Sequence, residues 1–398
     1  MARRSAGEGS VFQRSDKTKR SSWVAEIAVR LPDGSRKVVT GYGTTQKEAK
    51  AERERKVREA LAAAASRTRW TVGQYLDHFL AQCEARVRAN TMSIRTYATY
   101  ETDVRVNIKP RLGRVPLERL APHQVQEWIT GLLAEKSAAT TRKARATLHT
   151  ALEAAVDWGF LTKNPIPKRS GIQERAPEIV VWSEAEVTRF LDVAYHHRLY
   201  ALFYLAIDVG MRQGELLGLR WPDIDLDRNE IRIRKTLKTV PAKHRALATG
   251  NRKLEHLTGP HFLGEPKTPR SSRDVLLSRD TIQVLAAHFE AQLEEKRYTG
   301  PDYRDFGLVF CTGLGTPISQ RNLKRVYDRL IEKAAVPDAT FHDQRDLSAS
   351  LLIAKGVDIA VVSERLGHSR KSTTWDKYVR VVESARQRAV MSLREKLE

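Results

Sequence analysis

The chain has 398 residues, of which 41% are hydrophobic and 29% are charged, a composition typical of a water-soluble globular protein with two or three domains. It carries 69 Lys and Arg against 48 Asp and Glu, which gives a net charge of +21 and a pI of about 10.0. A surface this basic attracts polyanions, so nucleic acid is the leading partner and an anionic membrane a poor second.

Several other classes of protein are excluded by what the sequence lacks. No apolar run approaches the ~20 residues of a membrane span, and the N-terminus leads into polar sequence, so we expect a cytoplasmic protein with no membrane partner. Cys83 and Cys311 have neither disulfide nor zinc-ligand spacing, and without a Gly-Lys dipeptide there is no Walker A loop. Asp223, Asp225 and Asp227 are typical of a solvated turn rather than a Mg²⁺ site. We therefore expect no metal and no cofactor.

The first 66 residues are predicted to form a small α+β domain of a sheet and one helix. Trp23, Ala25, Ile27 and Val29 occupy alternate positions, as on one face of a half-buried strand, and 36–40 return as a second strand. A charged helix follows over 45–65. Residues 1–69 hold 17 basic and 8 acidic residues. A solvated helix face is the ordinary explanation of such charge, but the net charge of the chain favours contact of the sheet with DNA.

The middle segment, residues 70–165, is predicted to be an all-helical domain. From Trp70 the apolar residues follow the i, i+3, i+4 spacing of one helix face. Further helices are expected at 92–108, 122–135 and 140–158. Prolines at 165 and 167 then break the helical pattern, and a basic linker is expected over 166–180.

The remaining residues, 181–398, are predicted to form a mainly α-helical domain with a small β-sheet. Ser183 and Glu186 form a capping box, and the apolar run 200–209 is a buried helix. Strands are expected at 231–234 and 273–277, as partners in one sheet. Between them, 240–264 is polar and lacks a clear period, so it is expected to be a long loop.

Arg212 is the first candidate for phosphate chemistry. The buried helix stops at Gly210, and Gln213 can begin another, which places the Arg212 guanidinium near a helix N-terminus. The planar fork of an arginine matches phosphate oxygens, and Glu215 can hold it by a hydrogen bond. The alternative is an ordinary surface pair of Arg212 and Glu215.

The second set of candidates is nearer the C-terminus. His342 and Arg345 are three apart, so on a helix or its first turn they point the same way, a proton-exchanging imidazole beside a permanent cation. His368 can donate to a phosphate oxygen, and the phenol of Tyr378 is a nucleophile if cations stabilise the phenolate. Each alone is explained by a helix cap, a satisfied histidine or a packed tyrosine. Their ordered occurrence favours phosphodiester chemistry.

These segments resemble the tyrosine recombinase family, specifically an integrase of a phage or integrative element. Gly210 to Asp225 resembles the segment of the family's first arginine, His342 and Arg345 its His-x-x-Arg segment, and Leu366-Gly367-His368 with Tyr378 its last motif. Residues 266–273 resemble the hairpin that carries the family's lysine, which implies Lys267. The resemblance implies a helical core-binding domain at 70–165, an arm-type DNA-binding domain at 1–66 and a catalytic domain at 181–398.

The resemblance also implies a mechanism. Tyr378 would attack the scissile phosphate, leaving a 3′-phosphotyrosyl link and a 5′-hydroxyl, so that a mobile element is integrated, with excision as the reverse option. Arg212, Arg345 and His368 would stabilise the charge on the phosphate, His342 would assist proton movement, and Lys267 would protonate the leaving oxygen.

Two departures from the family pattern stand out. Asp346 occupies the position after the second arginine, where the family often has histidine, and an acid there either weakens phosphate binding or orients a neighbour. The segment before Lys267 is longer than usual, and Lys243 and Lys253 within it compete for the lysine role.

The implied partners are double-stranded DNA at core-type and arm-type sites and a homotetramer acting on two duplexes, with room for a DNA-bending host factor and a directionality factor. Two alternatives stay open at this point. A type IB topoisomerase shares the chemistry but relaxes DNA, and a non-catalytic DNA-binding regulator would keep the fold alone.

Overall fold

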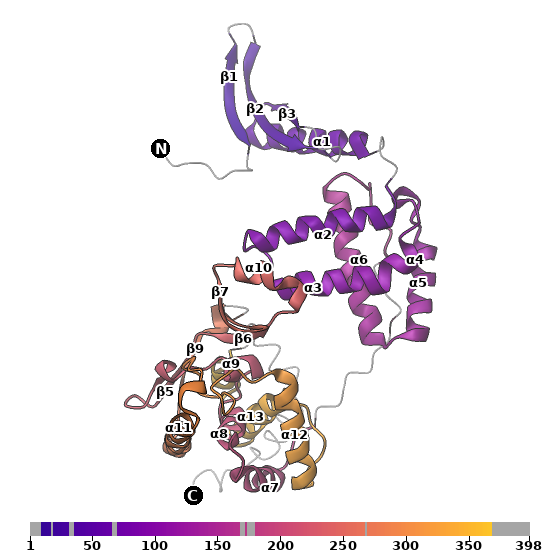
Figure 1. Cartoon of the computed structure of the whole chain (residues 1–398). Coiled ribbons are helices and arrows are strands. Elements are labelled where there is room, and N and C mark those ends of the chain that lie inside the picture. The colour runs from indigo at the N-terminus through magenta and orange to yellow at the C-terminus, as the bar shows by residue number, and fades with distance from the viewer. Residues whose placement is uncertain are drawn as a thin grey trace, which may run out of the picture. The chain divides into compact units, whose positions relative to one another are not determined.

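The computed structural model describes residues 9–16, 19–31, 36–65, 70–167, 172, 180–266 and 269–367. The chain folds as two units, Met1–Arg175 and Ala176–Glu398. Most of their helices and strands are labelled in Figure 1. None of the helices in the described ranges has the length and apolarity needed to cross a membrane.

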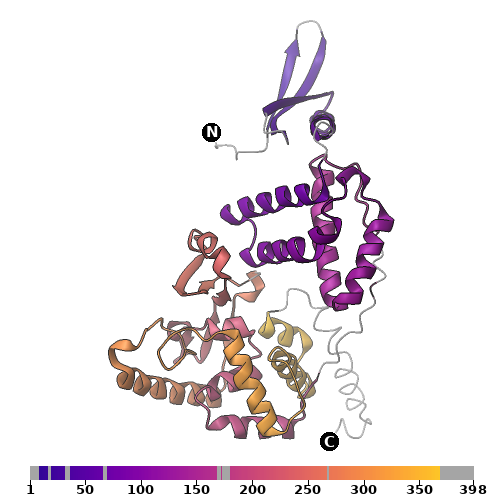
Figure 2. The same cartoon turned by 45° about the vertical axis from the view of Figure 1, so that its right-hand side comes forward.

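The first unit begins with an antiparallel sheet in the order β1-β2-β3 and a helix that packs on it. Their bounds are β1 Ser10–Asp16, β2 Lys19–Arg30, β3 Arg36–Gly43 and α1 Gln46–Ala65. Figure 2 shows α1 nearly end-on beside the sheet. The two expected strands and the helix are confirmed, whereas β1 was not expected. A Cβ on Gly41 would lie 2.2 Å from the Arg53 main-chain nitrogen, so only glycine lets the helix approach β3 this closely.

Helices make up the rest of the first unit, as predicted. Their bounds are α2 Val72–Arg88, α3 Ile94–Thr102, α4 Lys109–Leu112, α5 Pro122–Glu135 and α6 Ala138–Asp157. A π-helix over Asp103–Ile108 continues α3. Its first residue is buried and accepts hydrogen bonds from Asn107 (3.1 Å) and from Thr147 of α6 (2.7 Å), so a polar network ties the π-helix to its neighbour.

The second unit is built around a helix that is buried on nearly all sides. The helices are α7 Glu184–Tyr195, α8 Tyr200–Asp208, α9 Gln213–Leu217, α10 Arg245–Thr249, α11 Arg279–Thr299, α12 Gln320–Ala334, α13 Asp343–Ala354 and α14 Ile359–Leu366. Phe203 of α8 packs edge-on against Phe190 of α7 (ring centroids 5.8 Å apart) and stacks on Tyr327 of α12 (6.0 Å). The capping box of Ser183 and Glu186 is confirmed.

Two small sheets flank these helices. The first has the order β4-β5-β9 and the second β6-β8-β7. Their strands are β4 Ile224–Asp225, β5 Glu230–Ile233, β6 Thr236–Thr239, β7 Leu254–Thr258, β8 His261–Gly264 and β9 Arg273–Leu276. The pairing of β5 with β9 confirms the predicted sheet, with Ile231 opposite Val275. The prediction of a long loop over 240–264 is wrong, because this segment contains α10, β7 and β8. Every residue of β8 is buried, so its sequence lacks the alternation that marks a half-buried strand.

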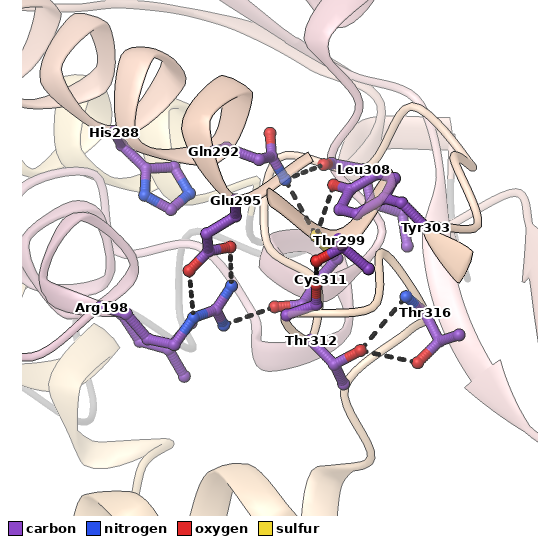
Figure 3. A network of polar contacts seen from close by, with 12 residues as sticks. Arg198, His288, Gln292, Glu295, Thr299, Tyr303, Leu308, Cys311, Thr312 and Thr316 are labelled. Atoms are coloured by element: carbon purple, nitrogen blue, oxygen red, sulfur yellow. Dashed lines mark hydrogen bonds and ion pairs between the residues drawn. The ribbon is translucent and has the colours of Figure 1, made fainter. Parts of the chain in front are cut away.

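A network of polar side chains anchors α11 to the segment that follows it (Figure 3). Arg198 donates to both carboxylate oxygens of Glu295 (2.9 and 2.6 Å) and to the Cys311 carbonyl (2.7 Å). Gln292 donates to the Leu308 carbonyl at 3.1 Å. Cys83 and Cys311 are both buried and unbridged.

Candidate active site

The first arm of the site is the turn between α8 and α9. The chain reverses at Gly210, which has φ +66°, and Arg212 is the residue before the first turn of α9. A Cβ at Gly210 would lie 2.5 Å from the Leu366 side chain and 3.0 Å from the Ser348 hydroxyl, so this turn requires glycine for both its conformation and its space.

Glu215 is the acceptor on which the site's donors converge. One carboxylate oxygen accepts a hydrogen bond from the Nη1 of Arg212 at 2.8 Å. The other accepts hydrogen bonds from the Arg212 main-chain N–H at 3.0 Å and from the Nη2 of Arg273 at 3.1 Å. Glu215 is only 3% exposed. Its burial alone would raise the pKa of the carboxyl, but Arg273 and then Arg212 outweigh that effect and hold the pKa below its ordinary value. The carboxylate is therefore charged at neutral pH and positions Arg212.

Arg345 lies on the first turn of α13 and is buried, with 3% of the residue exposed. Its Nη1 donates to the Gly210 carbonyl at 2.7 Å, and its Nη2 donates to the Leu366 carbonyl at the end of α14. One guanidinium thus joins the turn before Arg212 to the helix that precedes His368.

The end of α14 is where the arginines meet. Its last carbonyls have no partner within the helix, and three consecutive ones accept from side chains of other segments. The Arg365 carbonyl accepts from Arg273 (2.6 Å), the Leu366 carbonyl from Arg345, and the Gly367 carbonyl from Arg212 (3.2 Å). We call these three donors, Arg212, Arg273 and Arg345, the arginine cluster. The partial negative charge of a helix C-terminus suits three cations.

The structure thus brings Arg345 together with Arg212 and Glu215, a pair that lies in a distant part of the sequence. His342 immediately precedes α13 and is exposed, unlike the buried Arg345, so the two do not share an environment despite their spacing. His342 does not cap α13 with its side chain.

Three of the predicted site residues, Lys267, His368 and Tyr378, lie outside the described residues. Of the competing lysines in the preceding segment, Lys243 and Lys253 are both exposed. No group of His, Cys, Asp and Glu in the described ranges has the arrangement of a metal site. Asp346, the departure from the family pattern, is 3% exposed inside the unit.

Sequence reasoning missed Arg273 as a member of the site. It is the first residue of β9, in which Arg273 and Val275 are buried while Asp274 and Leu276 are exposed. A signal was present, because a charged residue in the alternating register of buried strand positions must have a partner. The predicted strand at 273–277 contained that signal.

Comparisons with known proteins identify the family to which the chain is similar. Residues 181–384 match the model described as "Phage integrase family", and 71–133 match "Phage integrase, N-terminal SAM-like domain". A tyrosine recombinase XerC-like protein of Caldanaerobacter subterraneus subsp. tengcongensis is 33% identical over 88% of this chain and 90% of its own. An integrase of Streptomyces ambofaciens is 25% identical over 94% of this chain and 93% of its own.

Solved structures share the fold. The integrase of the transposon Tn1549, solved with transposon right end DNA, aligns with a TM-score of 0.65 at 18% identity, over 81% of this chain and all of that chain (100%). A lambda integrase dimer bound to a core site aligns with a TM-score of 0.56 at 18% identity, over 94% of this chain and 96% of that chain. Since one family model covers about half of the sequence and the 33% identical relative is matched along most of its length, the chain belongs to the phage integrase family of tyrosine recombinases.

Proposed function

We propose that this tyrosine-type site-specific DNA recombinase cleaves its substrate with Tyr378, held against a phosphate by Arg212, Arg345 and His368. The observation that carries the proposal is the convergence of Arg212 and Arg345 on the end of α14. Both guanidinium groups bond to carbonyls within two residues of His368. The arrangement assembles positive charge before DNA arrives, which is how a preorganised site stabilises a charged transition state.

In the proposed step the Tyr378 oxygen attacks the scissile phosphorus, and the bond to the 5′-oxygen breaks. His342 takes the phenolic proton, and Lys267 gives a proton to the departing 5′-oxygen. The phosphodiester becomes a 3′-phosphotyrosyl ester with no net loss of a phosphate bond. A 5′-hydroxyl from a second duplex reverses the step, so strands are exchanged without a nucleotide cofactor.

The accessibility of the arginine cluster supports different roles for its members. The Arg212 side chain is 36% exposed, whereas Arg345 is 3% exposed. Arg212 is therefore the guanidinium that a phosphate reaches first, and Arg345 the one that sets the position of the α14 end.

DNA is the proposed partner of both units. The chain carries a net charge of +21, and the Tn1549 and lambda integrases of similar fold were solved with DNA. We assign residues 1–66 to arm-type sites and 70–165 to core-type sites, with 181–398 as the catalytic domain. A lambda integrase tetramer was solved on a Holliday junction, and four protomers on two duplexes are proposed here. The topoisomerase and regulator alternatives are not favoured by relatives that are named recombinase and integrase.

The test uses a nicked duplex that carries the attachment site, identified by sequencing junctions of integrated DNA. Wild-type protein should become covalently attached to it in EDTA, and Tyr378→Phe should abolish the adduct while mobility-shift binding is unchanged. Tyr298→Phe is the matched control, because Tyr298 is 96% exposed on α11 and should keep the adduct. An adduct formed by Tyr378→Phe at the wild-type rate would show that the nucleophile is another residue.

A further inference from the structure

Arg273 is the one buried member of the arginine cluster that the mechanism above does not use. Its side chain is 7% exposed, and it begins the strand that leads away from the segment containing Lys267. A buried arginine needs partners in several directions, since each of its N–H groups otherwise loses a hydrogen bond to water.

The partners of Arg273 come from three separate segments. Its Nη2 donates to Glu215 of α9 at 3.1 Å, its Nε to the Arg365 carbonyl at the end of α14 at 2.6 Å, and its Nη1 to the Ser271 carbonyl at 3.0 Å. The Ser271 hydroxyl in turn lies 3.4 Å from the Nη1 of Arg212. One side chain therefore joins the strand after Lys267, the support of Arg212 and the helix before His368.

Arg273 also sets the electrostatics of Arg212. Two guanidinium groups share the carboxylate of Glu215, so the three charges leave one positive charge in excess. Without Arg273 the carboxylate would be neutralised by Arg212 alone, and the charge that Arg212 offers to a phosphate would be largely cancelled. Burial lowers the pKa of the Arg273 guanidinium, and Glu215 opposes that effect.

We propose that Arg273 is a positioning residue for strand cleavage, which holds Glu215 and the end of α14 so that Arg212 presents an uncancelled charge to the scissile phosphate. The inference rests on the proposed function, because it assumes that Arg212 binds that phosphate. It deepens that function by adding a buried residue that acts through its protein partners, Glu215 and the Arg365 and Ser271 carbonyls.

The test compares Arg273→Met and Arg273→Lys with wild type on the nicked duplex, at saturating DNA. We expect the single-turnover rate of adduct formation to fall roughly 100-fold in Arg273→Met, as for a displaced catalytic group. The dissociation constant should change by less than about threefold, since the Arg273 side chain is only 7% exposed and its hydrogen bonds are to the protein. Arg273→Lys keeps the charge beside Glu215 but not the three-way contact, so its rate should lie between the two.

Arg198→Met is the matched control for lost packing. Arg198 also combines a carboxylate with a main-chain carbonyl, in the network of Figure 3, but these partners, Glu295 and Cys311, belong to α11 and the segment after it rather than to the site. This control should lower the melting temperature while the cleavage rate of the folded protein stays within about threefold of wild type.

A double-mutant cycle with Arg212→Lys separates positioning from general destabilisation. If Arg273 acts through Arg212, the fold-loss of cleavage rate in the double variant should be much smaller than the product of the fold-losses in the two single variants. A wild-type rate in Arg273→Met, a loss no larger than in Arg198→Met, or fully multiplicative losses would each overturn the inference while the proposed function stands. If wild-type protein itself forms no adduct, both proposals fall together.

Discussion

Replacing Glu215 by glutamine removes the charge on which two arginines depend and leaves the size of the side chain unchanged. Three donors converge on the carboxylate, namely the main-chain N–H and Nη1 of Arg212 and the Nη2 of Arg273. An amide has one oxygen and a nitrogen that only donates, so at least one of these donors would face another donor.

The size of the effect follows from exposure. Removing one partner of a buried ion pair costs about 3–5 kcal/mol, and the 7% exposed Arg273 is such a partner. Arg212 is 36% exposed and regains water, so its loss adds little. We therefore expect a loss of about 3 kcal/mol in the free energy of unfolding of the catalytic unit. For a unit of about 150–250 residues this lowers its melting temperature by about 6–12 °C.

Calorimetry of the full chain measures this shift, and Glu295→Gln is the matched control. Glu295 also accepts two hydrogen bonds from one arginine, but both side chains of that pair are about one-third exposed (34% and 31%). The control should cost about 1 kcal/mol or less. If Glu215→Gln lowers the melting temperature no more than Glu295→Gln does, Glu215 is not the buried centre of charge described here.

Three further outcomes are expected. The pKa of Glu215 is held below its ordinary value of 4.5, so the stability that the carboxylate contributes is fully present above pH 4.5 and is lost as the pH falls through the lower pKa of the folded state. The difference in melting temperature between wild type and Glu215→Gln should therefore shrink only in acid. Gly210→Ala should lower the free energy of unfolding by about 2–4 kcal/mol in chemical denaturation, because of backbone strain and the contact with Leu366. Gly259→Ala is the control and should cost about 1 kcal/mol, because Gly259 has φ +52° but open space around it. Deleting residues 1–69 should flatten the dependence of DNA affinity on salt between about 50 and 200 mM, measured by anisotropy; an unchanged slope would exclude this segment from DNA contact.

Local signals account for what the sequence predicted well. Helix α5 begins and ends at the predicted residues 122 and 135, with Pro122 at its first position, where a missing N–H costs nothing. The capping box of Ser183 and Glu186 is likewise a signal contained within four residues. Alternating residues were enough to predict the pairing of β5 with β9.

Signals that depend on distant partners were missed. The four residues of β8 are all buried, and they owe their strand conformation to β6 and β7 on either side. Burial on both faces removes alternation, and short strands add little propensity, so 240–264 was predicted to be a loop. The positions of Arg212, Glu215 and Arg345 along the chain indicated a site. The neighbouring residues in sequence, however, do not indicate which acceptor each guanidinium group bonds to.

Those acceptors explain why the site depends on so few side chains. Arg273, Arg345 and Arg212 bond to the carbonyls of three consecutive residues, 365 to 367, which are 92, 21 and 155 positions away in sequence. A main-chain carbonyl survives substitution of its own side chain, so Arg365→Ala would leave the carbonyl that accepts from Arg273 in place. Gly367 is the exception, because it has φ +67° and a Cβ there would lie 2.8 Å from the Arg270 carbonyl and 3.2 Å from the Nη1 of Arg273. Changes in the arginines remove these bonds directly, whereas a side chain at Gly367 would disturb them through Arg273. The segment that continues into His368 and Tyr378 therefore starts from a point fixed by the cluster proposed to bind the phosphate, and an altered arginine is expected to affect both.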